Sequence, residues 1–191
     1  MDDPVYKILK ITAIVLFAGF FGWMVLTGLQ EQVPGEKAYE AANRHFEDGQ
    51  YQQAIDQYDA ALQEDPQLLP AMRGKARSLM QMGKNQEALD VFNEVIYLQP
   101  DFAPSYANRG ILHDRMGHYR KAIADYEKSL ELDAEMVEGP NWLTRFLHLQ
   151  PEKPPTVAAR AAYLRQELDK PESERLLRVP EEDEKQRSYK K

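Results

Sequence analysis

One sequence pattern, present three times, decides the fold of this chain. The copies read GQYQQAIDQYDAALQEDPQL from Gly49, GKNQEALDVFNEVIYLQPDF from Gly83 and GHYRKAIADYEKSLELDAEM from Gly117. The three glycines are 34 residues apart, and an alanine and an aromatic residue follow each of them at fixed spacings. A period of this size predicts a repeat architecture rather than a single globular core.

Each copy predicts a pair of helices. In the first copy an amphipathic helix is expected from Glu36 to Asp48, and Gly49 supplies the positive φ that ends it. A second helix is expected from Tyr51 to Glu64, with Ala54 small enough to let the two helices cross closely. Pro66 ends this helix because it cannot donate the next helical hydrogen bond.

The third copy lacks the proline that closes the first two. Pro66 and Pro100 share the period, but Ala134 stands at the third position. No fourth copy follows, so the sequence predicts that this last helix runs through Met136 until Gly139 and Pro140 break it. It should then be the longest second helix of the three.

The pattern resembles the tetratricopeptide repeat family. The family pattern is an aromatic and a small residue in the first helix, then Gly, an aromatic, Ala, an aromatic, a further Ala and Pro. The third copy matches it with Tyr106, Gly110, Gly117, Tyr119, Ala122, Tyr126 and Ser129. Asn85 and Ala134 depart from it. The resemblance covers residues 36–136, as repeats of about 35–68, 69–102 and 103–136.

This resemblance implies an all-α, right-handed solenoid of three helix-turn-helix units. The first helices of the repeats would line a concave groove that binds a protein or an extended peptide. Repeat ends need a cap, because each repeat buries its face only against its neighbours. The groove positions of the family correspond here to Tyr39, Asn43, Phe46, Arg73, Arg77, Met80, Ala107, Ile111 and Asp114.

Two of these positions suggest the chemistry of the partner. Arg73 and Arg77 are four residues apart, so they share one helix face. Arginine grips a carboxylate with two parallel hydrogen bonds, which favours a peptide with an acidic group near its centre. The alternative is that both arginines pair with acidic neighbours on an acidic surface, where such pairs contribute only about 0–1 kcal/mol.

Some members of the family hold the acidic tails of heat-shock chaperones in a five-residue Lys/Asn/Arg clamp. Asn43 matches that clamp, whereas the other four positions hold Tyr39, Gly74, Pro104 and Asn108. The sequence therefore does not predict this type of clamp.

The N-terminal region contains a long uncharged segment. Ile11 to Leu29 has 19 residues without a charge, close to the roughly 20 that a helix needs to cross a membrane. We expect a tail at 1–10, a transmembrane helix at 11–29 that contacts the lipid bilayer, and a linker at 30–35. A cleaved signal peptide is the alternative, but its apolar region normally has about 7–15 residues.

Charges flanking this segment indicate its orientation. Lys7 and Lys10 precede it, and the nearest cation after it is Lys37, behind Glu31 and Glu36. Because positive residues favour the cytoplasmic side, the repeats are expected outside, in a bacterium as a single-pass inner-membrane protein facing the periplasm. This layout resembles scaffolds of envelope protein assembly, chaperoning or complex biogenesis. The alternatives are a cytosol-facing receptor or assembly factor, and a non-catalytic subunit of a membrane enzyme complex.

Residues after the repeats predict capping helices over 137–179. One would begin near Pro140 and carry Trp142. Another would begin at the N-cap Thr156, with an apolar stripe of Val157, Ala161, Leu164 and Leu168 and with Leu176 and Leu177 available for docking beyond it. Residues 180–191 lack apolar periodicity and are expected to be disordered.

Composition excludes several kinds of chemistry. The chain has no cysteine, so disulfides, thiol nucleophiles and cysteine-based zinc sites are absent. Its net charge of −7 does not favour nucleic acid. Of four histidines, His45 and His113 occupy a position that an aromatic usually fills in packing. We therefore predict no catalytic residue, metal site, cofactor or small-molecule substrate.

Overall fold

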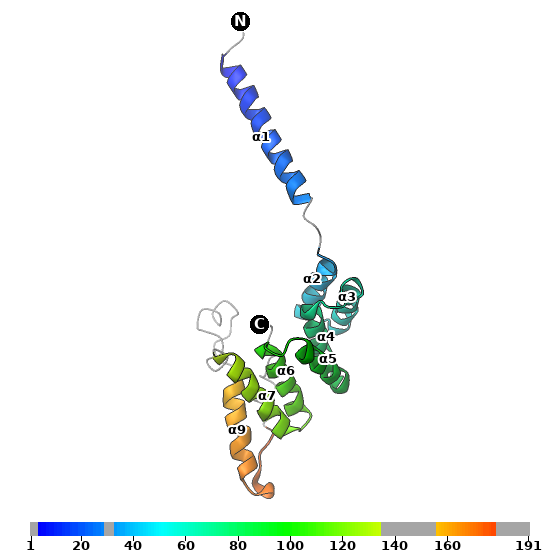
Figure 1. Ribbon diagram of the computed structural model, residues 1–191, viewed down its shortest axis with the longest axis vertical. Helices are drawn as coiled ribbons and strands as arrows, with labels where there is room; N and C mark the ends of the chain where they lie inside the picture. Colours follow the sequence, from blue (N-terminus) through cyan, green and yellow to red (C-terminus); the bar gives the residue numbers. More distant parts are fainter. Residues whose placement is uncertain (1–3, 29–32, 135–155, 179–191) are drawn as a thin grey trace. The chain divides into compact units, whose positions relative to one another are not determined.

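The computed structural model describes residues 4–28, 33–134 and 156–178, and in these ranges the chain is helical without β-strands. It separates into two compact units, Met1–Pro34 and Gly35–Lys191. Trp142, Pro140 and the predicted disordered segment 180–191 lie outside the described residues. Figure 1 shows the order of the helices along the chain.

The first unit contains one helix, α1 (Pro4–Gly28). It starts seven residues before the predicted span, so the expected tail at 1–10 is helical from Pro4 onward. Proline suits the first position of a helix, and the isolated charges of Lys7 and Lys10 do not interrupt it. In the described part of the chain α1 alone is long and apolar enough to cross a membrane, over Pro4–Met24. That property rests on length and composition.

The second unit contains three successive pairs of helices (Figure 1). The pairs are α2 (Glu36–Glu47) with α3 (Tyr51–Glu64), α4 (Leu69–Gln81) with α5 (Asn85–Leu98), and α6 (Ala103–Arg115) with α7 (Tyr119–Leu132). Consecutive helices contact each other throughout. Gly49, Gly83 and Gly117 each lie in the turn between the two helices of a pair, with φ of 74°, 73° and 77°, which confirms the positive φ expected there.

Buried alanines and aromatic rings hold each pair together. Ala54, Ala88 and Ala122 are fully buried, as are the aromatic residues four positions after each of them, Tyr58, Phe92 and Tyr126. A methyl group at each crossing lets the backbones approach, and the rings fill the space between neighbouring helices. The alanines and aromatic residues that recur in the sequence are thus the residues that pack the helices together.

The prediction of a longer last helix is wrong. Helices α3, α5 and α7 each have 14 residues. Each ends at a residue in a similar extended conformation: Asp65 at φ −135°, Gln99 at φ −137° and Asp133 at φ −145°. The backbone leaves the helix before the proline position whether or not proline follows. The exit is therefore a property of the repeat, and it persists at the third copy, where α9 packs against α7.

This observation predicts the effect of restoring the missing proline. Asp133 already has the extended backbone that a residue before proline prefers. We expect Ala134→Pro to leave the fold unchanged and to raise the free energy of unfolding by about 0.4–1 kcal/mol, through the unfolded state. Ser129→Pro, inside α7, should cost about 3 kcal/mol or more. Urea titrations followed by circular dichroism compare the two; a loss above about 1 kcal/mol for Ala134→Pro would contradict this view.

Helix α9 (Val157–Asp169) begins where Thr156 was expected as N-cap, and the Thr156 hydroxyl accepts the Ala159 N–H at 3.2 Å. Val157, Ala161 and Leu164 join the core of the later repeats. Leu168 is only half-buried, and Arg160 and Glu167 are buried in addition to the apolar stripe. After the short 3-10 helix η2 (Glu172–Glu174), the two leucines separate: Leu177 packs against this core, whereas Leu176 is 65% exposed.

Candidate functional site

The predicted groove residues lie on α2, α4 and α6, the first helices of the three repeats, and α4 contacts both of the others. Burial divides these residues into two groups. Tyr39, Asn43, Phe46 and Arg73 are half-buried, whereas Arg77, Met80, Ala107, Ile111 and Asp114 are between 0% and 5% exposed. We refer to Tyr39, Asn43, Phe46, Arg73 and Arg77 as the α2–α4 surface.

A tyrosine from α3 supports the α2–α4 surface from below. Tyr58 is fully buried, and its ring lies 6.2 Å from that of Tyr39. Its hydroxyl donates a hydrogen bond to Asn43 Oδ1 at 2.8 Å. Burial raises the pKa of Tyr58 to about 12, so the hydroxyl keeps its proton and remains a donor. The repeat pattern has an aromatic residue at this position, but it did not reveal the polar contact.

Gly74 on α4 makes room for that tyrosine. A Cβ at this position would stand 2.2 Å from Tyr58 Cζ and 2.5 Å from its hydroxyl oxygen. Any side chain here would collide with the ring. Gly74 is one of the positions of the heat-shock clamp, so the space for a clamp side chain is already filled. Asn43, the residue that matches the clamp, is bound to Tyr58.

Arg77 is 5% exposed, yet its close partners are uncharged. Its guanidinium lies 4.7 Å from the centroid of the Phe46 ring, and burial lowers its pKa. Tyr58 and, more weakly, Glu47 act in the opposite direction on this pKa. An arginine remains charged even so. The guanidinium of Arg77 thus lies over the Phe46 ring and hydrogen-bonds with Tyr58.

Arg73 repeats this arrangement one turn earlier. Its guanidinium lies 4.1 Å from the Phe102 ring centroid and donates to Gln99 Oε1 at 2.9 Å. Burial lowers its pKa as well. The ion pairs within 4.0 Å among the described residues involve neither Arg73 nor Arg77. The alternative that both arginines are paired with acidic neighbours does not match these contacts.

The third repeat does not contribute to an open groove. Ala107 and Ile111 belong to the same buried cluster as Val157, Ala161 and Leu164 of α9. Asp114 accepts two hydrogen bonds from Arg160, at 2.7 and 2.9 Å, and Arg178 donates to the carbonyl oxygen of Arg115. The expectation that these three positions line the groove is therefore wrong. The C-terminal segment contacts the end of α6 near Asp114, and Arg160 binds the Asp114 carboxylate.

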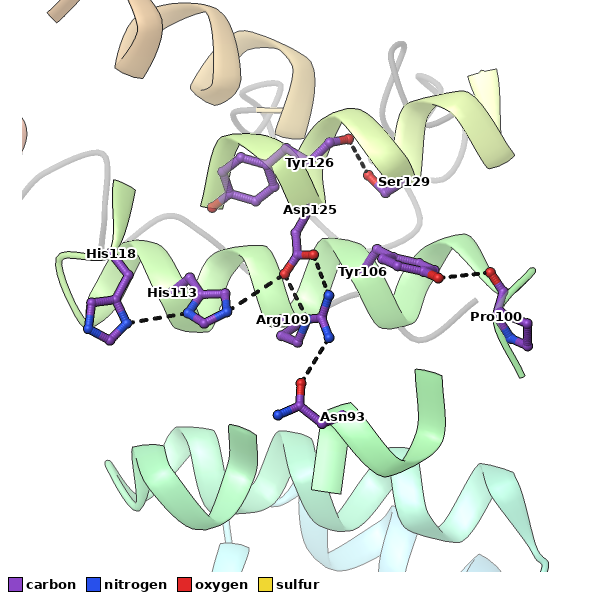
Figure 2. Close-up of polar contacts among 9 residues, drawn as sticks. All are labelled: Asn93, Pro100, Tyr106, Arg109, His113, His118, Asp125, Tyr126 and Ser129. Carbon is purple, nitrogen blue, oxygen red and sulfur yellow. Dashed lines mark hydrogen bonds and ion pairs between the residues drawn. The ribbon is translucent and has the colours of Figure 1, made fainter. Parts of the chain in front are cut away.

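A polar network joins α5, α6 and α7 (Figure 2). Arg109 donates to both oxygens of Asp125, at 2.8 and 2.6 Å, and to Asn93 Oδ1 at 2.8 Å. The hydrogen bond to Asp125 raises the pKa of Arg109. Periodicity could not reveal these residues, because a charge in an amphipathic pattern is ordinarily assigned to solvent.

Family comparisons agree with this fold. Tetratricopeptide repeat models match residues 45–108 and 103–135. Residues 45–135 are thus similar to tetratricopeptide repeats. RNA polymerase II-associated protein 3 of Xenopus laevis is 33% identical over 106 residues, which are 56% of this chain and 16% of that protein. Hsp70-Hsp90 organizing protein 3 of Arabidopsis thaliana is 27% identical over 103 residues, 54% of this chain and 18% of that protein. This chain thus spans less than a fifth of these relatives.

Solved structures show the same tetratricopeptide repeat fold. The first repeat domain of Spaghetti (RPAP3), bound to the HSP90 peptide SRMEEVD, aligns with a TM-score of 0.58 and 21% identity, over 72% of this chain and 94% of that one. The Arabidopsis OM64 domain aligns with a TM-score of 0.52 and 17% identity, over 61% and 93%. At these identities the likeness is one of fold.

Proposed function

We propose that this chain is a membrane-anchored scaffold that binds an extended, acidic segment of another protein on its α2–α4 surface. The observation that carries the proposal is the pair Arg73 and Arg77. Two cations stand one helical turn apart without an ion-pair partner among the described residues, in a chain whose net charge is −7. A carboxylate brought to them would form charge-assisted hydrogen bonds, which are about twice as strong as neutral ones.

Aromatic residues around the arginines define the rest of the site. Phe46 and Phe102 hold the guanidinium planes, and Tyr39 and Asn43 supply an apolar face and an amide beside them. Stacked guanidinium groups are pre-organised, so little side-chain entropy is lost when a partner binds. The chemistry is recognition of a peptide, with no bond made or broken.

The relatives support an acidic peptide as the partner, but the residues of this chain favour a different contact with its carboxylates. Spaghetti (RPAP3) is a repeat domain seen with an HSP90 peptide that contains two glutamates and an aspartate. Here the heat-shock clamp is not reproduced, because Tyr58 occupies the space above Gly74 and binds Asn43. We therefore assign the acidic contact to Arg73 and Arg77 of α4.

Site-specific crosslinking tests the surface. With p-benzoylphenylalanine in place of Tyr39 in the full chain in its native membrane, ultraviolet light should give a covalent adduct with one partner protein. The same group in place of Gln52, an exposed residue of α3, should not. The mapped segment should contain Asp, Glu or a C-terminal carboxylate. Equal adducts from both positions, or a segment without acidic groups, would contradict the proposal.

A membrane anchor accounts for the exposure of α1. Its large apolar side chains from Val5 to Met24 are 51% to 71% exposed, and the apolar stretch within Pro4–Met24 is not buried against other residues of the protein. Contact with lipid removes such surface from water, at about 25 cal/mol per Å². Lys7 and Lys10 stand in the first two turns, which favours a cytoplasmic N-terminus and repeats in the bacterial periplasm.

The orientation has its own test. Because the chain has no cysteine, a single cysteine at Gln52 reports one position without background. In intact bacterial cells an impermeant thiol reagent should label it. Labelling only after lysis would place the repeats in the cytosol, as a receptor or assembly factor, and would leave the peptide-binding proposal intact.

A further inference from the structure

Two histidines face each other across the turn between α6 and α7 (Figure 2). His113 lies in the last turn of α6, and His118 precedes the first residue of α7. Their Nδ1 atoms are 3.4 Å apart. The His113 side chain is nearly buried, whereas His118 is exposed to solvent. One nitrogen of the pair is thus fixed by packing and the other is accessible.

The other two repeats show that the fold does not require this pair. In the first repeat the same positions hold His45 and Gln50, whose Nδ1 and Oε1 atoms form a short contact of 2.6 Å. In the second repeat they hold Leu79 and Lys84. The turn therefore forms with a hydrogen-bonded pair in the first repeat and with a leucine and a lysine in the second. The two imidazoles of the third repeat therefore need an explanation beyond the turn itself.

The separation of the two nitrogens fits a shared metal ion better than a hydrogen bond. Hydrogen bonds donated by N–H normally measure about 2.7–3.2 Å between heavy atoms. Two imidazole nitrogens bound to one tetrahedral zinc ion, each at about 2.0–2.1 Å, stand roughly 3.3–3.4 Å apart. The pair in the third repeat has this second separation.

A carboxylate behind His113 prepares its Nδ1 atom for such a role. Asp125 Oδ2 lies 4.0 Å from His113 Nε2, on the side of the ring away from His118. The negative charge favours the tautomer with the proton on Nε2, which leaves a lone pair on Nδ1. Arg109 holds Asp125 in place with two hydrogen bonds. Burial lowers the pKa of His113, so the ring binds a proton less readily than a free imidazole does.

We propose that His113 and His118 bind a divalent transition-metal ion of the Zn²⁺ and Cu²⁺ class through their Nδ1 atoms. Asp114 lies between them in sequence but is held by Arg160. Among the described residues no third His, Cys, Asp or Glu joins the pair, so water fills the remaining positions on the side of His118. Bound metal would pin the end of α6 to the start of α7.

Nearby charges set the strength and the selectivity of this site. Arg109 and Lys121 act on His113 as positive charges and oppose a cation, while Asp125 favours one. With two protein ligands, binding is modest and follows the general order of divalent ions, in which Cu²⁺ exceeds Zn²⁺ and Mn²⁺ is weakest. Because the ligands must be unprotonated, binding should weaken as the pH falls.

Calorimetric titration of the full chain with Zn²⁺ tests the proposal, in detergent micelles at pH 7.5 and without a polyhistidine tag. The wild type should bind about one ion. His118→Gln and His113→Leu place at these positions the residues of the first and second repeats, so the fold is kept, and each should weaken binding at least tenfold. His45→Gln, the matched control, should change the affinity less than twofold.

Spectroscopy of the Cu²⁺ complex gives a second readout. Electron paramagnetic resonance should show coupling to two imidazole nitrogens in the wild type and to one in His118→Gln. A wild type that binds no Zn²⁺ would overturn the proposal and leave a hydrogen-bonded turn. So would binding that His118→Gln leaves unchanged, or binding that His45→Gln weakens equally.

Discussion

Asp114→Leu should lower the free energy of unfolding of the third repeat by about 3–5 kcal/mol. Asp114 and Arg160 are 4% and 7% exposed and share two hydrogen bonds, at 2.7 and 2.9 Å. Removing the carboxylate takes two charge-assisted hydrogen bonds away from a buried guanidinium. The contacts of Arg160 with the Leu177 carbonyl oxygen and the Tyr163 ring are with uncharged groups, so they do not replace the carboxylate.

A second substitution separates this explanation from simple loss of packing. Replacing both partners, as Asp114→Leu with Arg160→Met, should recover most of the lost stability, because an apolar pair of similar volume is often as stable as a buried ion pair. Lys128→Ala removes the exposed contact with Glu131 and should cost about 0–1 kcal/mol.

Hydrogen exchange of the full chain in micelles can localise the change. Repeats touch only their neighbours, so the loss of protection in Asp114→Leu should concentrate in α6, α7 and α9 and spare α2 and α3. Equal loss in all helices, or a double variant no more stable than the single one, would contradict the role assigned to this ion pair.

Gly74→Ala should destabilise the first two repeats by about 1–3 kcal/mol. Helix propensity alone predicts the opposite, since alanine is favoured over glycine inside a helix by roughly 1 kcal/mol. The sign is decided by the 2.2 Å approach of the new Cβ to Tyr58 Cζ. Tyr58 is fully buried and bonded to Asn43, so its ring has no free space to enter.

Combination with a smaller residue at position 58 checks the cause. Tyr58→Leu alone removes a buried ring and a hydrogen bond, and should itself be destabilising. In the Tyr58→Leu background, however, Gly74→Ala should cost less than about 0.5 kcal/mol, because contacting residues couple. Urea titrations of the four proteins give the coupling energy. Additive effects, or a stabilising Gly74→Ala in the wild type, would contradict the steric explanation.

The repeats were predictable from sequence because their contacts are local and recur in phase. The turns at Gly49, Gly83 and Gly117 and the buried alanine five residues beyond each of them follow from one pattern that occurs three times. The extended end of α7 was missed, because proline was taken as the cause of an exit that Asp133 makes without it.

Contacts outside the period could not be read in the same way. Asp114 and Arg160 are 46 positions apart, in segments that share no pattern, and charged residues are assigned to solvent by default. Arg73 and Arg77 were found because four-residue spacing places them on one face. Their neutral partners Gln99, Phe102 and Phe46 depend on how the repeats stack.

The most direct test of the acidic-partner proposal removes the two positive charges and measures capture. The variant is Arg73→Gln with Arg77→Met, since a glutamate substituted at the 5%-exposed position 77 would itself be buried and would disturb the fold. Hydrogen bonds to charged groups contribute about 1.5–3 kcal/mol each. With the crosslinker at Tyr39, the adduct yield at limiting partner concentration should therefore fall at least tenfold. Lys75→Gln, on the same helix as the two arginines, removes a charge that is paired with Asp59 of α3 and should change the yield less than twofold. An undiminished yield from a folded double variant would contradict the assignment of this surface.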